Sequence, residues 1–303
     1  MPMPDPVILS IGAFQLRWYG LFAALALLGT YAILSLRVKK SPLKSDDLST
    51  ILTFCVIFGL IGARLEYVRR FWGESFAGDP MGVCRVWEGG LVFQGGFILA
   101  AIAVWLLCLY KKWPVGGVAD LMAPALPVGH AIARLGCLFN GCCFGIPWKH
   151  FGGIQYPASG NDVLHTQFLL GQLPEGTITP LPVLPIQALE SLWCLLVAGA
   201  ILLCERKGLL KNRLFFLYLI GYSIGRFFLE FLRGDYHQNG GLTPAQHTTL
   251  FCIFPCTVLI LYFTQPKPLG ELLYQFTKGR HPLREKLDEI DRKYRHKHDH
   301  RDH

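Results

Sequence analysis

The sequence predicts an all-α polytopic membrane protein with seven transmembrane helices and two long external loops. Of its 303 residues 52% are hydrophobic and only 17% are charged, whereas soluble domains average about 25% charged residues. Seven apolar segments approach the ~20 residues that a helix needs to cross hydrocarbon. A spanning segment must satisfy its own backbone hydrogen bonds, so each is expected to be helical. The segments are 19–36, 48–68, 91–110, 119–139, 186–204, 214–232 and 246–264.

The distribution of Lys and Arg predicts the orientation of these spans. Twenty of the 29 basic residues lie in the tail and in the linkers after the first, third and fifth spans. Basic residues favour the cytoplasmic side, so the N-terminus is expected outside and the C-terminus in the cytoplasm. The net charge of +8 then belongs to the membrane surface and indicates no nucleic acid partner. We expect one transmembrane domain, 1–264, followed by a basic, His-rich cytoplasmic tail, 265–303.

Two external loops, 69–90 and 140–185, are longer than ordinary connections. Loops of this length usually have a role in function. Each is expected to be either a cap that packs on itself or a lid over a site. The glycine pairs at 89–90 and 95–96 fit either close helix packing or close approach of the backbone to a ligand.

Charged side chains inside the predicted spans are Arg64, Arg134, Arg226 and Glu230. Each costs roughly 2.5–3.5 kcal/mol to insert near the centre of a bilayer, so each needs a partner or a wet cavity. Arg226 and Glu230 are four residues apart and are expected to pair on one helix face. The pair is either a structural ion pair or part of a polar cavity in the outer half of the membrane. Unbalanced arginines that converge at one depth suit a phosphate group.

Three cysteines follow Arg134 in the segment HAIARLGCLFNGCCFG at 130–145. Cys137, Cys142 and Cys143 are expected to be structural thiols, with a disulfide from Cys142 or Cys143 to Cys84 as one arrangement in an oxidising compartment. A thiol of lowered pKa that acts as a nucleophile is a second reading. A metal site is a third, but only His130 and His150 lie close in sequence, so no metal and no cofactor are predicted. The other cysteines are expected to be small hydrophobic residues, and these are Cys55, Cys108, Cys194, Cys204, Cys252 and Cys256.

Five segments in this order along the chain resemble the bacterial prolipoprotein diacylglyceryl transferase family. They are RWYG at 17–20, GARLEYV at 62–68, VWEGGLVFQGG at 86–96, ARLGCLFNG at 133–141 and GRFFLEFLRGD at 225–235. The resemblance covers roughly residues 7–264. It implies a seven-helix enzyme of the bacterial cytoplasmic (inner) membrane, surrounded by membrane lipids, with its N-terminus outside.

The resemblance also implies a reaction. The family transfers the diacylglyceryl group of phosphatidylglycerol to the lipobox cysteine thiol in the signal peptide of a prolipoprotein, in lipoprotein biogenesis. By motif position Arg134 and Arg226 match its essential arginines and Glu230 its acidic residue, and we add Gln94 as a catalytic position. The residues expected to bind substrate are Tyr19, Arg64, Gly95, Gly96, Asn140, Gly141 and Arg233.

The chain departs from the family pattern at several of these positions. Gln94 stands where the family has a histidine, its usual candidate for general base, and glutamine can only orient or hydrogen-bond. Cys137 and Cys142 replace an asparagine and a glutamate of the signature segment, while Gln187 and Glu190 are retained. Two alternatives therefore stay open: a divergent lipid-group transferase with another acceptor, and a membrane thiol–disulfide oxidoreductase. A non-enzymatic lipid-binding or transport protein is a further reading.

Overall fold

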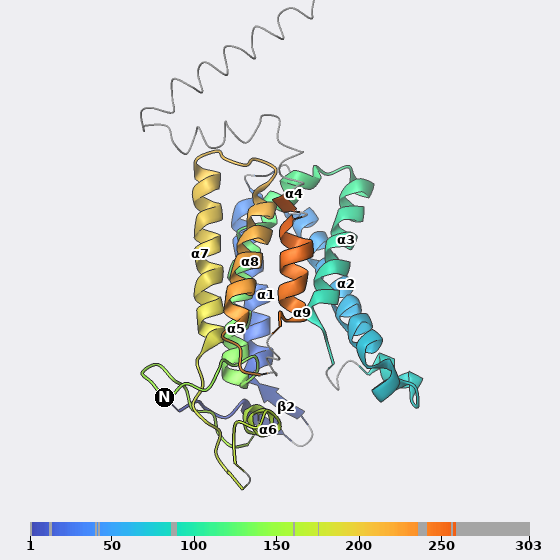
Figure 1. The fold of residues 1–303 in the computed structure, drawn as a ribbon. Helices are drawn as coiled ribbons and strands as arrows, with labels where there is room; N and C mark the ends of the chain where they lie inside the picture. Colours follow the sequence, from blue (N-terminus) through green and yellow to red (C-terminus); the bar gives the residue numbers. More distant parts are fainter. Residues whose placement is uncertain are drawn as a thin grey trace, which may run out of the picture.

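The computed structural model describes residues 2–11, 14–39, 41, 43–85, 90–159, 161–174, 176–235, 241–255 and 257–258. The part of the chain that it describes is mostly helical, as predicted, and the long helices run side by side (Figure 1). Its helices and strands are β1 (Val7–Ile11), β2 (Phe14–Arg17), α1 (Trp18–Val38), α2 (Ser45–Phe71), α3 (Phe93–Lys111), α4 (Val115–Met122), α5 (Ala125–Asn140), α6 (Val163–Leu169), α7 (Ile186–Arg206), α8 (Leu214–Glu230) and α9 (Pro244–His247). Short π-helical turns occupy Trp72–Phe76 and Thr248–Ile253, and a 3-10 helix occupies Pro80–Cys84.

Five helical segments among these residues are long and apolar enough to cross a membrane: α1, α2, α3, the combined segment Val115–Asn140, and α7. The sixth predicted span corresponds to α8, which has 17 residues. The seventh, 246–264, is described as far as Val258 except for position 256, and its residues 259–264, like the tail 265–303, lie outside the described residues. The chain is therefore a multi-pass helical membrane protein, and the number seven stays a prediction.

The fourth predicted span is not one continuous helix. It divides into α4 and α5, with Pro124 immediately before the first residue of α5. Proline lacks a backbone N–H and cannot continue a helical hydrogen-bond pattern, which explains the break. The backbone at Ala123 and Pro124 keeps right-handed helical dihedral angles, so α4 and α5 together form one helical segment that is interrupted at Pro124.

An antiparallel hairpin of β1 and β2 precedes α1, and the sequence analysis did not predict it. It lies at the same end of the bundle as α6 and the long loop 141–185 (Figure 1). The backbone N–H of Met3 also donates to the Gln155 carbonyl at 2.8 Å, so the N-terminus is attached to that loop. The charge distribution predicts this end to be the external face.

The loop 141–185 packs on itself, as the first of the two readings predicted. Phe144, Ile154, Tyr156, Val163 and Val183 form a buried core of their own. Burial raises the pKa of Tyr156, which keeps the phenol neutral, and its hydroxyl donates to the Leu138 carbonyl at 2.7 Å. The cap is thereby joined to the last turn of α5.

Glycines allow α2 and α3 to approach closely. A Cβ atom on Gly62 would lie 2.4 Å from the Gly95 carbonyl oxygen, and one on Gly96 would lie 2.6 Å from that of Gly59. Such distances are below any normal contact, so the two backbones touch only because these positions have no side chain. Of the two readings of the pair at 95–96, the structure favours helix packing.

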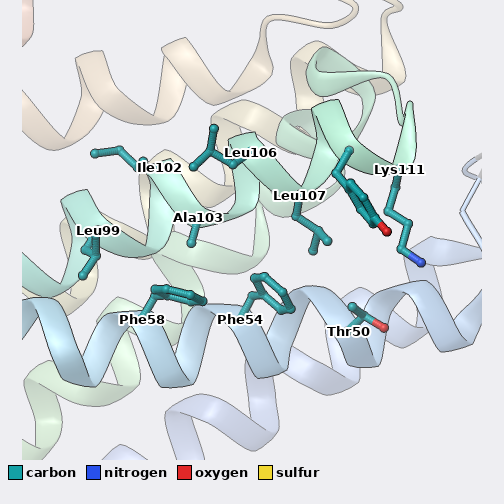
Figure 2. Close-up of a pocket in the computed structure, with 10 residues that line it drawn as sticks. Thr50, Phe54, Phe58, Leu99, Ile102, Ala103, Leu106, Leu107 and Lys111 are labelled. Atoms are coloured by element: carbon teal, nitrogen blue, oxygen red, sulfur yellow. The ribbon is translucent and has the colours of Figure 1, made fainter.

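The opposite end of the bundle is held by polar contacts. The Asp120 carboxylate accepts the backbone N–H groups of Asn212 at 2.5 Å and Leu214 at 2.7 Å, which caps the start of α8. Arg37 pairs there with Glu205 of α7 at 2.8 Å. An apolar groove between α2 and α3 lies towards the Lys111 end of α3 and is lined by side chains such as Phe54, Phe58 and Leu106 (Figure 2). It is therefore at the far half of α3 from Gln94.

Candidate active site

A chain of buried ion pairs connects α5, α7 and α8. Arg134 Nε lies 2.8 Å from Glu190 Oε2, and the other Glu190 oxygen lies 3.2 Å from Arg226 Nη1. Arg226 Nη2 lies 2.9 Å from Glu230 Oε2, which confirms the pair predicted from their spacing. Arg233 Nη1 follows at 3.6 Å from the same Glu230 oxygen. These side chains are between 3% and 15% exposed, so the charges act in a medium of low dielectric constant.

Local sequence explains why these groups meet. Arg134 lies in the second half of α5, and Glu190 lies one turn into α7, which starts directly after Pro185. The Ser191 hydroxyl donates to the Ala131 carbonyl at 2.8 Å and so sets the relative position of α7 and α5. Arg226 and Glu230 are one helical turn apart on α8, at the same end of the bundle.

The expectation of unbalanced arginines was wrong, because carboxylates match the guanidinium groups. Arg233 also pairs with Asp235 at 2.5 Å, so Arg134, Arg226 and Arg233 face Glu190, Glu230 and Asp235. The sequence analysis noted that Glu190 was retained but did not count it among the charges within spans. It is the sole acidic residue of the segment 186–204. A single carboxylate in an apolar segment is the sequence signal that could have identified Glu190 as a member of the cluster.

Arg134 has the most open guanidinium of the cluster. Its Nε faces Glu190, while Nη1 lies 4.0 Å from Cys137 Sγ. Within the described ranges its Nη atoms have no other hydrogen-bond partner. A phosphate oxygen is the type of acceptor that such a charged donor pair binds.

Polar atoms without hydrogen bonds lie on the same three helices. His130 Nδ1 on α5, Gln187 Oε1 on α7 and Ser223 Oγ on α8 are buried and have no partner within the described part of the chain. The His130 ring lies between Phe93, with ring centres 6.0 Å apart, and Tyr222, at 5.6 Å. Buried polar groups without partners are typical of a place that holds water or a ligand. This supports a polar cavity here rather than a structural ion pair alone.

The three thiols after Arg134 form one cluster. The sulfur atoms of Cys137, Cys142 and Cys143 all lie within 4.8 Å of one another. Tyr19, at the start of α1, is close enough to interact electrostatically with all three and with Arg134. The predicted site residues at the ends of α1 and α5 are therefore brought together.

Cys84 is an exposed free thiol in the structure, which shows no disulfide to Cys142 or Cys143. Asn140 is the last residue of α5, and Gly141 follows it with a φ of +73°, the left-handed conformation that ends many helices. A Cβ atom on Gly141 would lie 2.9 Å from the Asn161 Cβ. Gly141 is thus required by the turn that carries the chain from α5 into the cap.

Arg64 forms hydrogen bonds with the first external loop. Its guanidinium donates to the carbonyl oxygens of Gly82 at 2.6 Å, Val83 at 2.9 Å and Gly90 at 3.1 Å. Its charged group also lies 5.5 Å from the centre of the Tyr67 ring. These contacts hold Gly82, Val83 and Gly90 against α2, so Arg64 has the partners that a charged residue within a predicted span requires.

Gln94 lies in the first turn of α3 and is exposed. Its side-chain oxygen accepts a hydrogen bond from Arg70 Nη2 at 3.3 Å, and Gly95 and Gly96 after it face α2. The preceding residue, Phe93, is the one that reaches His130. The VWEGG motif falls mostly on 86–89, outside the described residues.

Comparison with known proteins identifies the family of this chain. The family model described as prolipoprotein diacylglyceryl transferase matches residues 6–262. The chain is 33% identical over 252 residues to the phosphatidylglycerol–prolipoprotein diacylglyceryl transferase of Parasynechococcus marenigrum (strain WH8102), covering 80% of this chain and 84% of that protein. It is 31% identical over 260 residues to the enzyme of that name from Staphylococcus aureus (strain JH9), covering 85% and 88%. The chain therefore belongs to the prolipoprotein diacylglyceryl transferase family.

Proposed function

We propose that this protein transfers the diacylglyceryl group of phosphatidylglycerol to the cysteine thiol of a prolipoprotein signal peptide. The relatives carry both substrates in their names. The observation that carries the proposal is the buried chain of ion pairs from Arg134 to Arg233, with its open side at Arg134. The three arginines and three carboxylates balance in charge, so an added phosphate needs donors that the carboxylates do not occupy, and the Nη atoms of Arg134 are such donors.

In this reaction the thiolate sulfur attacks the glyceryl carbon that bears the phosphate. A C–S bond forms, the C–O bond to phosphate breaks, and glycerol phosphate leaves with one more negative charge than the bound lipid phosphate had. Cations directed at the phosphate oxygens, where negative charge develops, lower the activation barrier of transfer most, because they are already oriented in a low-dielectric site. Arg134 is placed to bind the phosphate oxygens, and Arg226 and Arg233 add positive charge behind it.

The carboxylates have a positioning role in this proposal. Glu190 holds Arg134 and Arg226 at 2.8 Å and 3.2 Å, and Glu230 holds Arg226 at 2.9 Å. Long arginine side chains lose conformational freedom when they bind, and fixed carboxylates reduce that cost at the moment of lipid binding. Tyr19 and Asn140 lie at the end of the site near the thiols, and Gln94 accepts a hydrogen bond from Arg70.

We further propose the finer topology that the sequence predicts. Seven spans place the N-terminus outside and the tail in the cytoplasm of the bacterial inner membrane. Glu190 near the start of α7, and Glu230 at the end of α8, then lie in the external half of the bilayer. This is the side on which a secreted preprotein presents its lipobox cysteine after translocation.

The test is a transfer assay with purified protein in vesicles that contain labelled phosphatidylglycerol and a lipobox peptide. Arg134→Ala should abolish labelling of the peptide while the protein stays inserted. Arg37→Ala is a matched control, because Arg37 also makes a carboxylate pair but at the opposite end of the bundle. Full transfer by Arg134→Ala would contradict the role of the arginine, and equal loss in both variants would show a folding defect instead.

A further inference from the structure

The three-cysteine cluster has the composition and spacing of a metal site. Tetrahedral zinc, with bonds of about 2.3 Å to sulfur, requires sulfur atoms about 3.8 Å apart. The sulfur atoms of Cys137, Cys142 and Cys143 lie within 4.8 Å of one another and are half-buried. Small side-chain rotations therefore bring them to ligand positions. The sequence analysis predicted no metal because it looked for further ligands nearby in sequence, whereas folding brings these three together.

Hydrogen bonds anchor the backbone on both sides of the cluster and so fix the positions from which the three thiols converge. Gln187 Nε2 donates to the Cys142 carbonyl at 2.7 Å, and the Gly234 N–H donates to the Phe144 carbonyl at 3.0 Å. Between them Cys143 has a φ of +56°, a conformation that side chains other than glycine rarely adopt. Strained residues of this kind persist where the surrounding structure holds them, and they cluster at functional sites.

Charge favours a divalent ion. Three thiolates around Zn²⁺ give a net charge of −1, and Arg134 Nη1 lies 4.0 Å from Cys137 Sγ. Arg134 and Arg233 also interact electrostatically with Cys143. With an acceptor thiolate in the fourth position the charge becomes −2 for Zn²⁺ and −3 for a monovalent ion such as Cu⁺, beside the two positive charges of Arg134 and Arg233. Soft thiolate ligands exclude Mg²⁺ and Ca²⁺, which prefer oxygen.

We propose that Cys137, Cys142 and Cys143 bind one Zn²⁺ ion whose fourth position receives the thiol of the acceptor cysteine. Catalytic zinc sites keep three protein ligands and an open position for water or substrate. A thiol that coordinates zinc loses its proton to solvent and becomes a thiolate. This second half of the proposal rests on the proposed function, and it supplies the thiolate that the transfer requires in a chain with glutamine at position 94.

The arrangement places both reactants beside one arginine. The thiolate bound at zinc lies next to Arg134, which binds the phosphate of the lipid in the proposed function. The sulfur then attacks the glyceryl carbon, the C–O bond breaks, and the thioether product is a weaker zinc ligand than the thiolate because it is neutral. Water replaces the product at the fourth position, and the three protein thiolates stay bound.

Metal binding is tested with Co²⁺ alone on the reduced full-length protein in detergent. One equivalent should give sulfur-to-cobalt charge-transfer bands and the visible bands of tetrahedral cobalt, and Zn²⁺ should abolish both. Cys137→Ser and Cys143→Ser should weaken binding about 10- to 100-fold or more, whereas Cys204→Ser, which alters a thiol at the far end of α7, should not. Histidines of the tail cannot produce a sulfur band. Absence of that band from the reduced protein would overturn the proposal.

The fourth position is tested separately with a lipobox peptide and its Cys→Ser form. X-ray absorption at the zinc edge should show three sulfur ligands alone and four with the cysteine peptide. Removal of zinc should slow transfer about 100-fold, the lower range of what a positioned proton acceptor contributes, and added zinc should restore it. Transfer that is indifferent to zinc would overturn the acceptor role while the proposed function stands. A fourth sulfur without any transfer would instead overturn the proposed function and leave the metal site in place.

Discussion

Replacement of Glu190 by glutamine is the perturbation whose result the structure predicts most directly. The carboxylate lies between Arg134 and Arg226, at 2.8 Å and 3.2 Å, and its side chain is 8% exposed. Glu190→Gln keeps the shape but removes the charge, so Arg134 loses its carboxylate partner and Arg226 keeps its pair with Glu230. Removing one partner of a buried pair costs about 3–5 kcal/mol, because the remaining charge stays desolvated.

A loss of about 3–5 kcal/mol corresponds to a fall in Tm of about 6–20 °C for a chain of this size class. Thermal unfolding in detergent, followed by thiol labelling or fluorescence, measures this fall. Glu205→Gln is the matched control, because Glu205 is on the same helix and also pairs with an arginine, but its side chain is 41% exposed. Exposed pairs contribute about 0–1 kcal/mol, so the control should melt within a few degrees of the wild type.

The change in Tm on addition of lipid gives this experiment a second readout. The phosphate of phosphatidylglycerol supplies negative charge beside Arg134, so the lipid should raise the Tm of Glu190→Gln more than that of the wild type. Phosphatidylcholine, whose choline cation neutralises its phosphate, should give a smaller rise. If Glu190→Gln melts like Glu205→Gln and responds equally to both lipids, the buried ion-pair chain does not hold the site together.

Three further predictions concern single positions. Arg226→Lys should lose most transfer in the vesicle assay although the charge is kept, because one ammonium cannot contact Glu190 and Glu230 through two separate nitrogens; wild-type rates would refute this. Asp120→Ala should lower the free energy of unfolding by about 1–3 kcal/mol in thermal melts, because two backbone N–H groups at the start of α8 lose their acceptor. Gly62→Val should prevent close contact of α2 and α3, so cysteine pairs introduced across this interface should crosslink in the parent protein but not in the variant.

Much of the fold follows from patterns that the sequence shows. The apolar segments predict where long helices lie, since burial of a backbone in lipid requires internal hydrogen bonds. The break between α4 and α5 follows from Pro124, but a hydropathy pattern alone cannot show whether proline kinks or divides a helix. The hairpin of β1 and β2 is too short to give a periodic signal.

The candidate site was predictable in part. Arg226 and Glu230 share a helix, so their spacing alone predicts the pair. Glu190 comes from another helix, and its link to Arg134 depends on how α7 packs against α5, which local sequence does not determine. The cysteines illustrate the same limit, because C-x4-C-C is not a usual metal spacing. It becomes a cluster only through the turn at Gly141 and the conformation of Cys143.

The central claim is that this chain carries out diacylglyceryl transfer through the cluster around Arg134. Its most direct test is complementation of a bacterial strain depleted of its own prolipoprotein diacylglyceryl transferase. The wild-type chain should restore growth and give prolipoproteins the mass of a diacylglyceryl thioether, and Arg134→Ala, inserted to the same level, should do neither. Failure of the inserted wild type, or rescue by Arg134→Ala, would contradict it.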